Sequence, residues 1–143
     1  MREMEGYRFV HARDVEFRDV DVGGHVNNAV YVTYLETARI AYLVEVLGAD
    51  FAYELSLILA NITVDFRSPA RFPERLETGA RVTRVGTKSF AMEHEMRGGD
   101  GRLVLEASSV LVAYDYEANA SMAVPEDWRT RLDAYEERSS VAT

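Results

Sequence analysis

One long helical pattern constrains the fold of this chain more than any other feature of its sequence. Between Ala29 and Leu47, apolar side chains recur at steps of three and four residues and form a broad apolar face. These side chains are Tyr31, Tyr34, Leu35, Ala38, Ala41 and Tyr42. A helix of this length would extend about 28 Å, enough to run across a small sheet. Asn27 or Asn28 is a candidate N-cap, and Gly48 is a candidate end of the helix.

The rest of the sequence alternates between apolar and polar residues, as half-buried strands do. Strands are predicted at residues 7–18, 57–66, 75–85, 89–97 and 102–116. Strands joined by tight turns lie antiparallel, and Gly98-Gly99-Asp100-Gly101 is typical of a hairpin turn. The element order β-α-β-β-β-β predicts an α+β fold in which the helix covers one face of the sheet. Apolar positions on the other face need a partner, so we expect the chain to assemble with further copies.

Two details of the strand pattern concern which residues face the core. In residues 57–66 the alternation places one apolar set on a single face, namely Ile58, Ala60, Ile62, Val64 and Phe66. His11 and His94 also fall on apolar strand faces, where a histidine is more often a hydrogen-bonded core residue than a catalyst.

Length and composition favour a single globular domain over residues 1–143, with a core at about 7–116 and a C-terminal tail at 117–143. The net charge of −8 argues against a nucleic-acid or membrane-surface binder. The chain has no cysteine and three histidines, so neither a metal site nor a cofactor is expected. Met1 to Gly6 is polar and no apolar run reaches about 20 residues, which predicts a cytoplasmic protein.

The chemistry of the sequence concentrates in the ten residues before the helix, Asp19-Val20-Asp21-Val22-Gly23-Gly24-His25-Val26-Asn27-Asn28. The first N–H groups of a helix have no partner within it and carry the positive end of its dipole. Such a helix start can hold an anion, or an oxygen that becomes anionic during a reaction. The segment therefore combines a carboxylate, a flexible turn and free donors in one place.

This layout resembles the hotdog fold, in which an antiparallel five-stranded sheet wraps around one long central helix. The sequence is most similar to the 4-hydroxybenzoyl-CoA thioesterase-like acyl-CoA thioesterases. The resemblance lies in Asp19 to Tyr31 with Tyr34 and Glu36-Thr37-Ala38-Arg39, in Val64-Asp65-Phe66-Arg67-Ser68-Pro69-Ala70, and in Gly86-Thr87-Lys88-Ser89-Phe90. It implies an enzyme that hydrolyses an acyl-CoA thioester to the free acid and coenzyme A. It also implies a homodimer or homotetramer with its sites where two subunits meet.

The resemblance assigns roles to individual residues. Asp21 aligns with the nucleophile or general base of these thioesterases. Gly24 aligns with the glycine of the turn, and Asn28 with the helix-start position whose backbone N–H polarises the thioester carbonyl. Lys88 and Ser89 fall in a segment that lies near the coenzyme A moiety in relatives.

The residues themselves suggest further candidates beside these. The Asn27 N–H is a second candidate oxyanion donor, and His25 is a candidate to bond the thioester carbonyl or Asp21. A purely local role for His25 is an equal alternative. Asp21 taken alone would be interpreted as a turn cap, but its place beside Gly-Gly-His-Val-Asn-Asn favours catalysis. Tyr31 is a core residue and a candidate for lining the acyl pocket. Arg67, with Arg84 and Lys88, supplies local positive charge for the phosphates of coenzyme A, although charged strand positions are usually solvated surface.

Other functions remain open at this stage. The string His25-Val26-Asn27-Asn28 also resembles plant acyl-carrier-protein thioesterases, but Gly23 stands where those enzymes have Asn. An acyl-carrier-protein thioesterase is therefore one alternative, and a non-catalytic acyl-binding module is another. A hotdog dehydratase would need a catalytic His and acid from opposite sides of a dimer, and the Asp before the helix argues against it.

Overall fold

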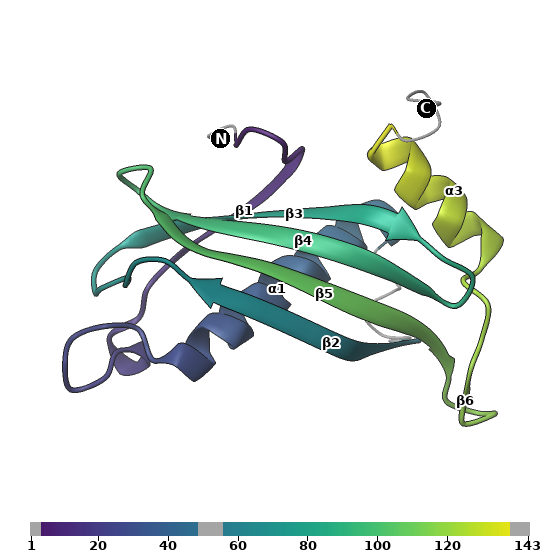
Figure 1. Cartoon of the computed structure of the whole chain (residues 1–143), viewed down its shortest axis with the longest axis horizontal. Coiled ribbons are helices and arrows are strands. Elements are labelled where there is room, and N and C mark those ends of the chain that lie inside the picture. The colour runs from purple at the N-terminus through teal and green to yellow at the C-terminus, as the bar shows by residue number, and fades with distance from the viewer. Residues whose placement is uncertain (1–3, 49–55, 138–143) are drawn as a thin grey trace.

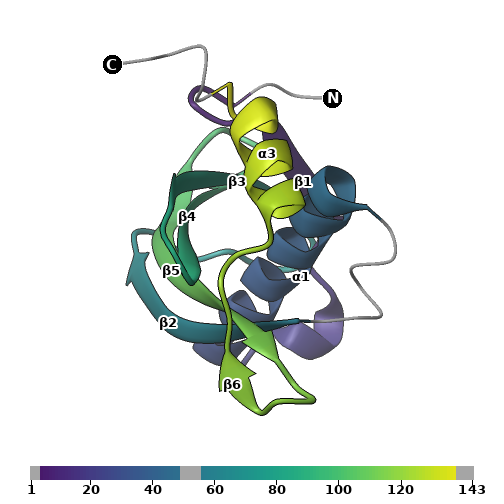
Figure 2. The same ribbon diagram turned by 90° about the vertical axis from the view of Figure 1, so that its right-hand side faces the viewer.

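The computed structural model describes residues 4–48 and 56–137, and it contains one antiparallel sheet with one long helix against it (Figure 1). The helices are α1 (Asn28–Leu47) and α3 (Glu126–Tyr135), with a 3-10 turn η1 (Phe17–Asp19). The strands are β1 (Phe9–Asp14), β2 (Leu57–Phe66), β3 (Arg75–Val85), β4 (Ser89–Gly98), β5 (Leu103–Asp115) and β6 (Ala120–Ser121). Their order is β1-β3-β4-β5-β2, and the two-residue β6 pairs with β5. The predicted α+β fold is confirmed, with the sheet curved around α1 (Figure 2).

The first strand is shorter than the predicted 7–18. β1 ends at Asp14, and one further ladder bond follows it, from the Val15 N–H to the Glu74 carbonyl at 2.8 Å. The chain then turns through η1, which leaves the Phe17 side chain 74% exposed although the alternation placed it on the apolar face. Extending the strand to residue 18 was therefore wrong: the backbone turns at Phe17–Asp19 while the apolar pattern continues.

The face predicted for the second strand is wrong, because β2 contains a β-bulge. Leu57 pairs with Ala113 and Ile62 with Ser109, and the register shifts between Leu59 and Asn61. An extra residue in a bulge reverses the alternation, so residues on the two sides of it differ in phase. Leu57, Ile62 and Val64 therefore pack against the core, and the predicted set that began at Ile58 and Ala60 does not form one face.

The core between α1 and the sheet consists of two apolar clusters with a polar layer between them. One cluster gathers Tyr31, Tyr34, Leu35, Leu76, Met96 and Leu105, and the other gathers Tyr42, Leu43, Val82, Phe90, Met92 and Leu111. Among the described residues four buried polar side chains make up the polar layer: Arg39, Thr78, His94 and Ser109. Along β4, for example, His94 separates Met96 of the first cluster from Met92 of the second.

Part of the C-terminal tail closes one end of this core. α3 lies beside the C-terminal half of α1 (Figure 2), and its Leu132 is fully buried. The Glu136 carboxylate just after α3 accepts hydrogen bonds from the Tyr42 hydroxyl at 2.5 Å and the Val82 N–H at 3.1 Å. Residues 126–136 are thus a structural part of the domain.

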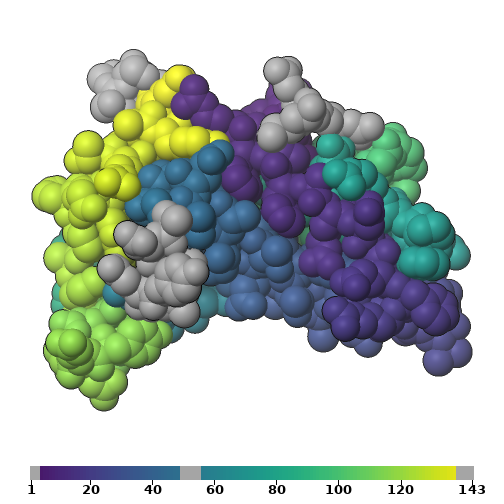
Figure 3. Space-filling model, turned by 180° about the vertical axis from the view of Figure 1, so that it is seen from behind, coloured from purple at the N-terminus to yellow at the C-terminus, as the bar shows by residue number. Residues whose placement is uncertain are grey.

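Two surfaces of the sheet and helix layer carry no other element of the described chain. Seen from behind, α1 lies at the surface between the N-terminal segment and α3 (Figure 3), and its Val32 is exposed. Within the described residues β2 pairs only with β5, so its other edge is open. No helix in residues 4–48 and 56–137 has the length and apolar character needed to span a membrane.

Candidate active site

The loop before α1 is a tight turn built around Asp21. The Asp21 Oδ1 atom accepts hydrogen bonds from the Gly23 N–H at 2.9 Å and the His25 N–H at 3.2 Å. The Asp21 N–H donates to the His25 carbonyl at 2.8 Å. Gly24 has φ of 81°, a conformation that glycine adopts at little cost. The cap-like role considered for Asp21 is thus present, but it uses one of the two carboxylate oxygens.

Asn27 and Asn28, at the start of α1, differ in their hydrogen bonds. Asn27 is the N-cap, because its Oδ1 accepts the Ala29 N–H at 2.9 Å. The Asn27 N–H donates to the Asp19 carbonyl at 3.0 Å, so it is not the free oxyanion donor that the sequence suggested. The Asn28 N–H has no hydrogen-bond acceptor in the described parts of the chain. The structure therefore leaves Asn28 as the unpaired donor at the helix start.

Asp21 and Asn28 border the same cavity of about 270 Å³. The cavity is lined by Asp21, His25, Val26, Asn28, Tyr31, Phe66, Arg67, Ser68 and Pro69. The loop, the first turn of α1 and the end of β2 thus enclose it together. Two further cavities, of about 340 Å³ on the outer face of the sheet and about 700 Å³ beside α3, contain neither Asp21 nor Asn28.

His25 lines this cavity, and its Nε2 atom has no hydrogen-bond partner among the described residues. A buried polar atom without a partner costs free energy. The Nε2 atom is shielded from solvent, so the structure does not show it bonding a substrate or a water.

Tyr31 forms part of the wall between the cavity and the core. Its ring is buried and lies 5.4 Å from the Phe66 ring, measured between centroids. Its hydroxyl accepts the Ala70 N–H at 2.9 Å, and the Ala70 carbonyl in turn accepts the Val26 N–H at 2.9 Å. Burial raises the pKa of Tyr31, so the phenol stays neutral and supports the loop rather than taking up protons.

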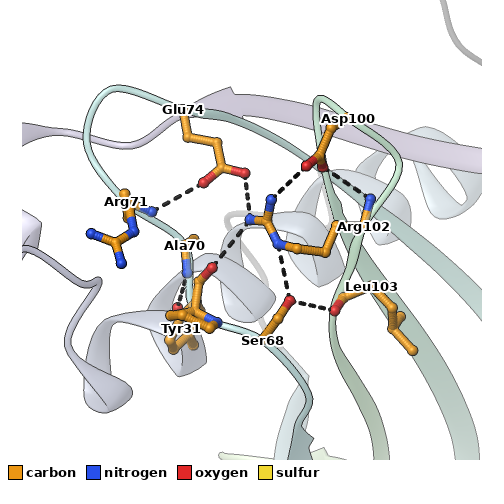
Figure 4. A network of polar contacts seen from close by, with 9 residues as sticks. Tyr31, Ser68, Ala70, Arg71, Glu74, Asp100, Arg102 and Leu103 are labelled. Carbon is orange, nitrogen blue, oxygen red and sulfur yellow. Dashed lines mark hydrogen bonds and ion pairs between the residues drawn. The ribbon is translucent and has the colours of Figure 1, made fainter.

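A polar network that the sequence did not reveal holds the far wall of the cavity (Figure 4). The Arg102 guanidinium donates to Glu74 at 2.6 Å, to the Pro69 carbonyl at 3.1 Å and to Ser68 Oγ at 3.1 Å. Glu74 also accepts the Arg71 N–H at 3.0 Å. One arginine thereby fixes the backbone that follows β2. Neither Arg102 nor Glu74 belongs to a sequence motif, and only the folded chain brings them together.

The residues predicted to contact coenzyme A lie in two separate parts of the chain, one at the cavity and one at the other end of the sheet. Arg67 lies at the cavity, where its guanidinium pairs with Glu106 at 3.0 Å, and both side chains are about half exposed. Such exposed pairs contribute little stability, so Arg67 can exchange partners at small cost.

Lys88, Ser89 and Arg84 lie at the opposite end of the sheet. Ser89 pairs with Val112 of β5, whereas Phe66 at the cavity pairs with Leu105. Seven residues of strand separate these positions, roughly 24 Å. A single chain therefore does not bring Lys88, Ser89 or Arg84 to the Asp21 cavity.

Comparisons with known proteins are consistent with this site. A model of the thioesterase-like superfamily matches residues 15–132. A thioesterase from Thermus thermophilus, solved in complex with coenzyme A and Zn, is 34% identical, with a TM-score of 0.86 over 94% of this chain and 98% of that one. Long-chain acyl-CoA thioesterase FadM of Escherichia coli (strain K12) is 26% identical over 117 residues, 80% of this chain and 89% of the relative.

Acyl-CoA thioester hydrolase YbgC of Escherichia coli O6:H1 is 28% identical over 104 residues, 71% of this chain and 78% of the relative. The range matched by the superfamily model contains the Asp21 loop, α1 and the strands β2 to β5. In the described residues, no group of three or more His, Asp or Glu side chains is placed to hold a metal ion.

Proposed function

Because the chain belongs to the thioesterase-like superfamily, we propose that it hydrolyses an acyl-CoA thioester to the free acid and coenzyme A at the Asp21 cavity. One observation carries the proposal: Asp21, which has a carboxylate, and Asn28, which has an unpaired helix-start N–H, line the same cavity. Relatives named as acyl-CoA thioesterase and acyl-CoA thioester hydrolase support acyl-CoA as the substrate class.

In the proposed reaction a water molecule adds to the thioester carbonyl carbon while the Asp21 carboxylate takes a proton from it. The negative charge that develops on the carbonyl oxygen is stabilised by the Asn28 N–H and the positive end of α1. The C–S bond then breaks, and the proton held by Asp21 passes to the departing sulfur of coenzyme A. Asp21 Oδ1 already accepts two backbone bonds, so Oδ2 is the oxygen available for the proton.

Direct attack by Asp21 is the second route to the same products. It would form an anhydride between Asp21 and the acyl group, which water then cleaves. A single turnover in ¹⁸O-labelled water can reveal the anhydride. Unlabelled acid with label in Asp21 indicates an anhydride cleaved at the Asp21 carbon, whereas label in the acid alone shows only that water attacked the acyl carbon, of the thioester or of the anhydride.

We further propose that the active unit is a homodimer in which the open edges of two β2 strands pair antiparallel. Such a pairing sets the Phe66 end of one β2 against the Leu57 end of the other. Leu57 pairs with Ala113, and the Ala113 N–H donates to the Lys88 carbonyl at 2.9 Å, so Lys88 lies at that same end. The second copy would thus bring Lys88 and Ser89 toward the Asp21 cavity of the first. The open surface of α1 would be covered in the same step.

Acyl-carrier-protein substrates and a purely binding role are the remaining alternatives. Carrier proteins are usually acidic, and a net charge of −8 opposes their docking. A binding module would need Asp21 only as a cap. The cytoplasmic location expected from the sequence remains a prediction that cell fractionation would check.

The test is hydrolysis of a panel of aromatic and aliphatic acyl-CoAs, followed by release of free thiol, with wild type and Asp21→Asn. We expect wild type to turn over at least one class and Asp21→Asn to lose about 10²-fold or more in kcat. Asn keeps an oxygen for the Gly23 and His25 N–H groups, so the variant should stay folded. An Asp21→Asn variant with wild-type kcat would contradict the assignment of Asp21. A wild type inert on every acyl-CoA would contradict the proposed substrate.

A further inference from the structure

The second carboxylate of the loop, Asp19, is anchored to α1. Its Oδ2 atom accepts a hydrogen bond from the Tyr34 hydroxyl at 2.5 Å. Tyr34 is 2% exposed and lies about two helical turns beyond the N-cap Asn27. Asp19 is not among the residues that line the cavity, so it does not touch a substrate bound there.

The backbone of Asp19 binds the helix start at the same time. Its carbonyl accepts the Asn27 N–H at 3.0 Å, and its own N–H donates to the Glu16 carbonyl at 2.9 Å. Asp19 is thus attached to α1 at two points. Its side chain bonds to Tyr34 in the second turn, and its carbonyl bonds to Asn27, the residue before Asn28. The position of the Asn28 N–H relative to the Asp21 turn depends on this double attachment.

A stacked arginine encloses the Tyr34 side of the anchor. The Arg13 guanidinium lies over the Tyr34 ring, 3.9 Å from its centroid, and pairs with Glu16 at 3.2 Å. Burial, followed by the bond to Asp19, raises the pKa of Tyr34 to about 12. The phenol therefore stays protonated and donates to Asp19 across the working pH range of a protein.

We propose that Asp19 and Tyr34 are positioning residues for thioester hydrolysis, holding the Asp21 carboxylate and the Asn28 N–H at a fixed separation. This inference rests on the proposed function of the same cavity. Reacting groups displaced by about 1 Å can lose on the order of 10²-fold in rate, so loosening the anchor should lower kcat even though neither residue contacts the substrate.

The chain contains a matched control for this bond. Tyr42 also lies on α1, is 0% exposed, and donates to a carboxylate, that of Glu136, at 2.5 Å. Its bond ties the other end of α1 to α3, away from the cavity. Tyr34→Phe and Tyr42→Phe each remove one hydroxyl from one helix, so their difference isolates the effect on the site.

The experiment compares steady-state kinetics on the best acyl-CoA of the panel for wild type, Tyr34→Phe, Tyr42→Phe and Asp19→Ala, which has no side-chain acceptor for the Tyr34 hydroxyl. We expect Tyr34→Phe and Asp19→Ala to lower kcat about tenfold with KM nearly unchanged, and Tyr42→Phe to stay within about twofold of wild type. Because the two residues act through one bond, the double variant should lose no more than Tyr34→Phe alone. Equal kcat values for Tyr34→Phe and Tyr42→Phe would overturn the inference.

Hydrogen exchange of the Asn27 amide supplies a readout that does not need activity. This N–H donates to the Asp19 carbonyl, so Tyr34→Phe should speed its exchange about tenfold while Tyr42→Phe leaves it unchanged. An inert wild type with this exchange difference would contradict the proposed function and still support the anchor. Unchanged exchange in Tyr34→Phe would overturn the anchor whatever the activity.

Discussion

At the scale of single residues, the two aspartates and the two asparagines before and at the start of α1 have different contacts and therefore different roles. Asp19 and Asp21 both precede α1, but Asp19 is bonded to Tyr34 while Asp21 borders the cavity. Asn27 and Asn28 are neighbours, but Asn27 caps the helix, whereas Asn28 lines the cavity and has an unpaired N–H. In each pair the residue type is the same, and the two residues differ in the hydrogen-bond partners that the folded backbone brings near them.

The role of the Asn28 N–H can be tested by removing that group alone. Asn28 is the first residue of α1, a position where proline is well tolerated, and Asn27 has the extended backbone (ψ 138°) that a residue before proline prefers. We therefore expect Asn28→Pro to fold with nearly unchanged stability but to lose about 10²- to 10³-fold in kcat.

Asn28→Ala is the matched control, because it removes the side chain and keeps the N–H. Its kcat should stay within about threefold of wild type, measured in the same thiol-release assay. If Asn28→Ala were as impaired as Asn28→Pro, the side chain rather than the backbone would be the functional group.

At the scale of elements, the packing of α1 on the sheet includes a polar layer that is costly to bury. The His94 ring nitrogens and Ser109 Oγ are buried without a regular hydrogen bond to any described residue, and so is one guanidinium nitrogen of Arg39. Burial, followed by the positive charge of Arg39, lowers the pKa of His94 from 6.5 to about 4. The predicted burial of His94 is confirmed, whereas His11 is only partly buried.

This layer predicts how stability depends on pH. His94 stays neutral in the folded chain down to about pH 4 but takes up a proton near pH 6.5 when unfolded, so the unfolded state binds more protons between these values. The free energy of unfolding should therefore fall as the pH drops through this window. Over this pH window the free energy of unfolding of wild type should fall by on the order of 3 kcal/mol more than that of His94→Met, as measured by denaturant unfolding. Parallel pH curves for the two proteins would contradict the prediction.

At the scale of the whole molecule, one chain contains only part of the predicted site. Asp21, His25, Asn28, Tyr31 and Arg67 meet at the cavity, whereas Lys88, Ser89 and Arg84 lie at the other end of the sheet. The proposed antiparallel pairing of two β2 edges would bring the two groups together, because it would set the ends of the two sheets against each other.

Mixing two defective variants tests this shared site. In a mixed dimer of Asp21→Asn and Lys88→Glu chains, one site would combine the intact Asp21 of one chain with the intact Lys88 of the other. Random mixing should then restore about a quarter of wild-type activity, assayed at low acyl-CoA concentration after refolding the two chains together. If each chain held a complete site, both variants would stay defective and the mixture would show no gain.

The sequence by itself determined the features that depend on neighbouring residues. The three- and four-residue spacing determined α1, the alternation determined the buried faces of β3 and β4, and the short separation of Asp21 from Asn28 determined that both lie at one helix start. These features follow from periodicity, caps and turns, which act over a few residues. The family resemblance placed the same segment in a thioesterase, and the superfamily match confirmed the family.

Only the tertiary structure decided which distant groups meet. In the folded chain β1 ends at Asp14 and a bulge reverses the phase of β2. Arg102 bonds to Ser68 and Pro69 of the cavity lining, and the Asn27 N–H bonds to the Asp19 carbonyl. Each outcome depends on contacts between segments far apart in the chain, or on a backbone hydrogen bond that any residue type could make. Side-chain pattern carries no information about such contacts, because it records which face a residue prefers and not which partner lies opposite it.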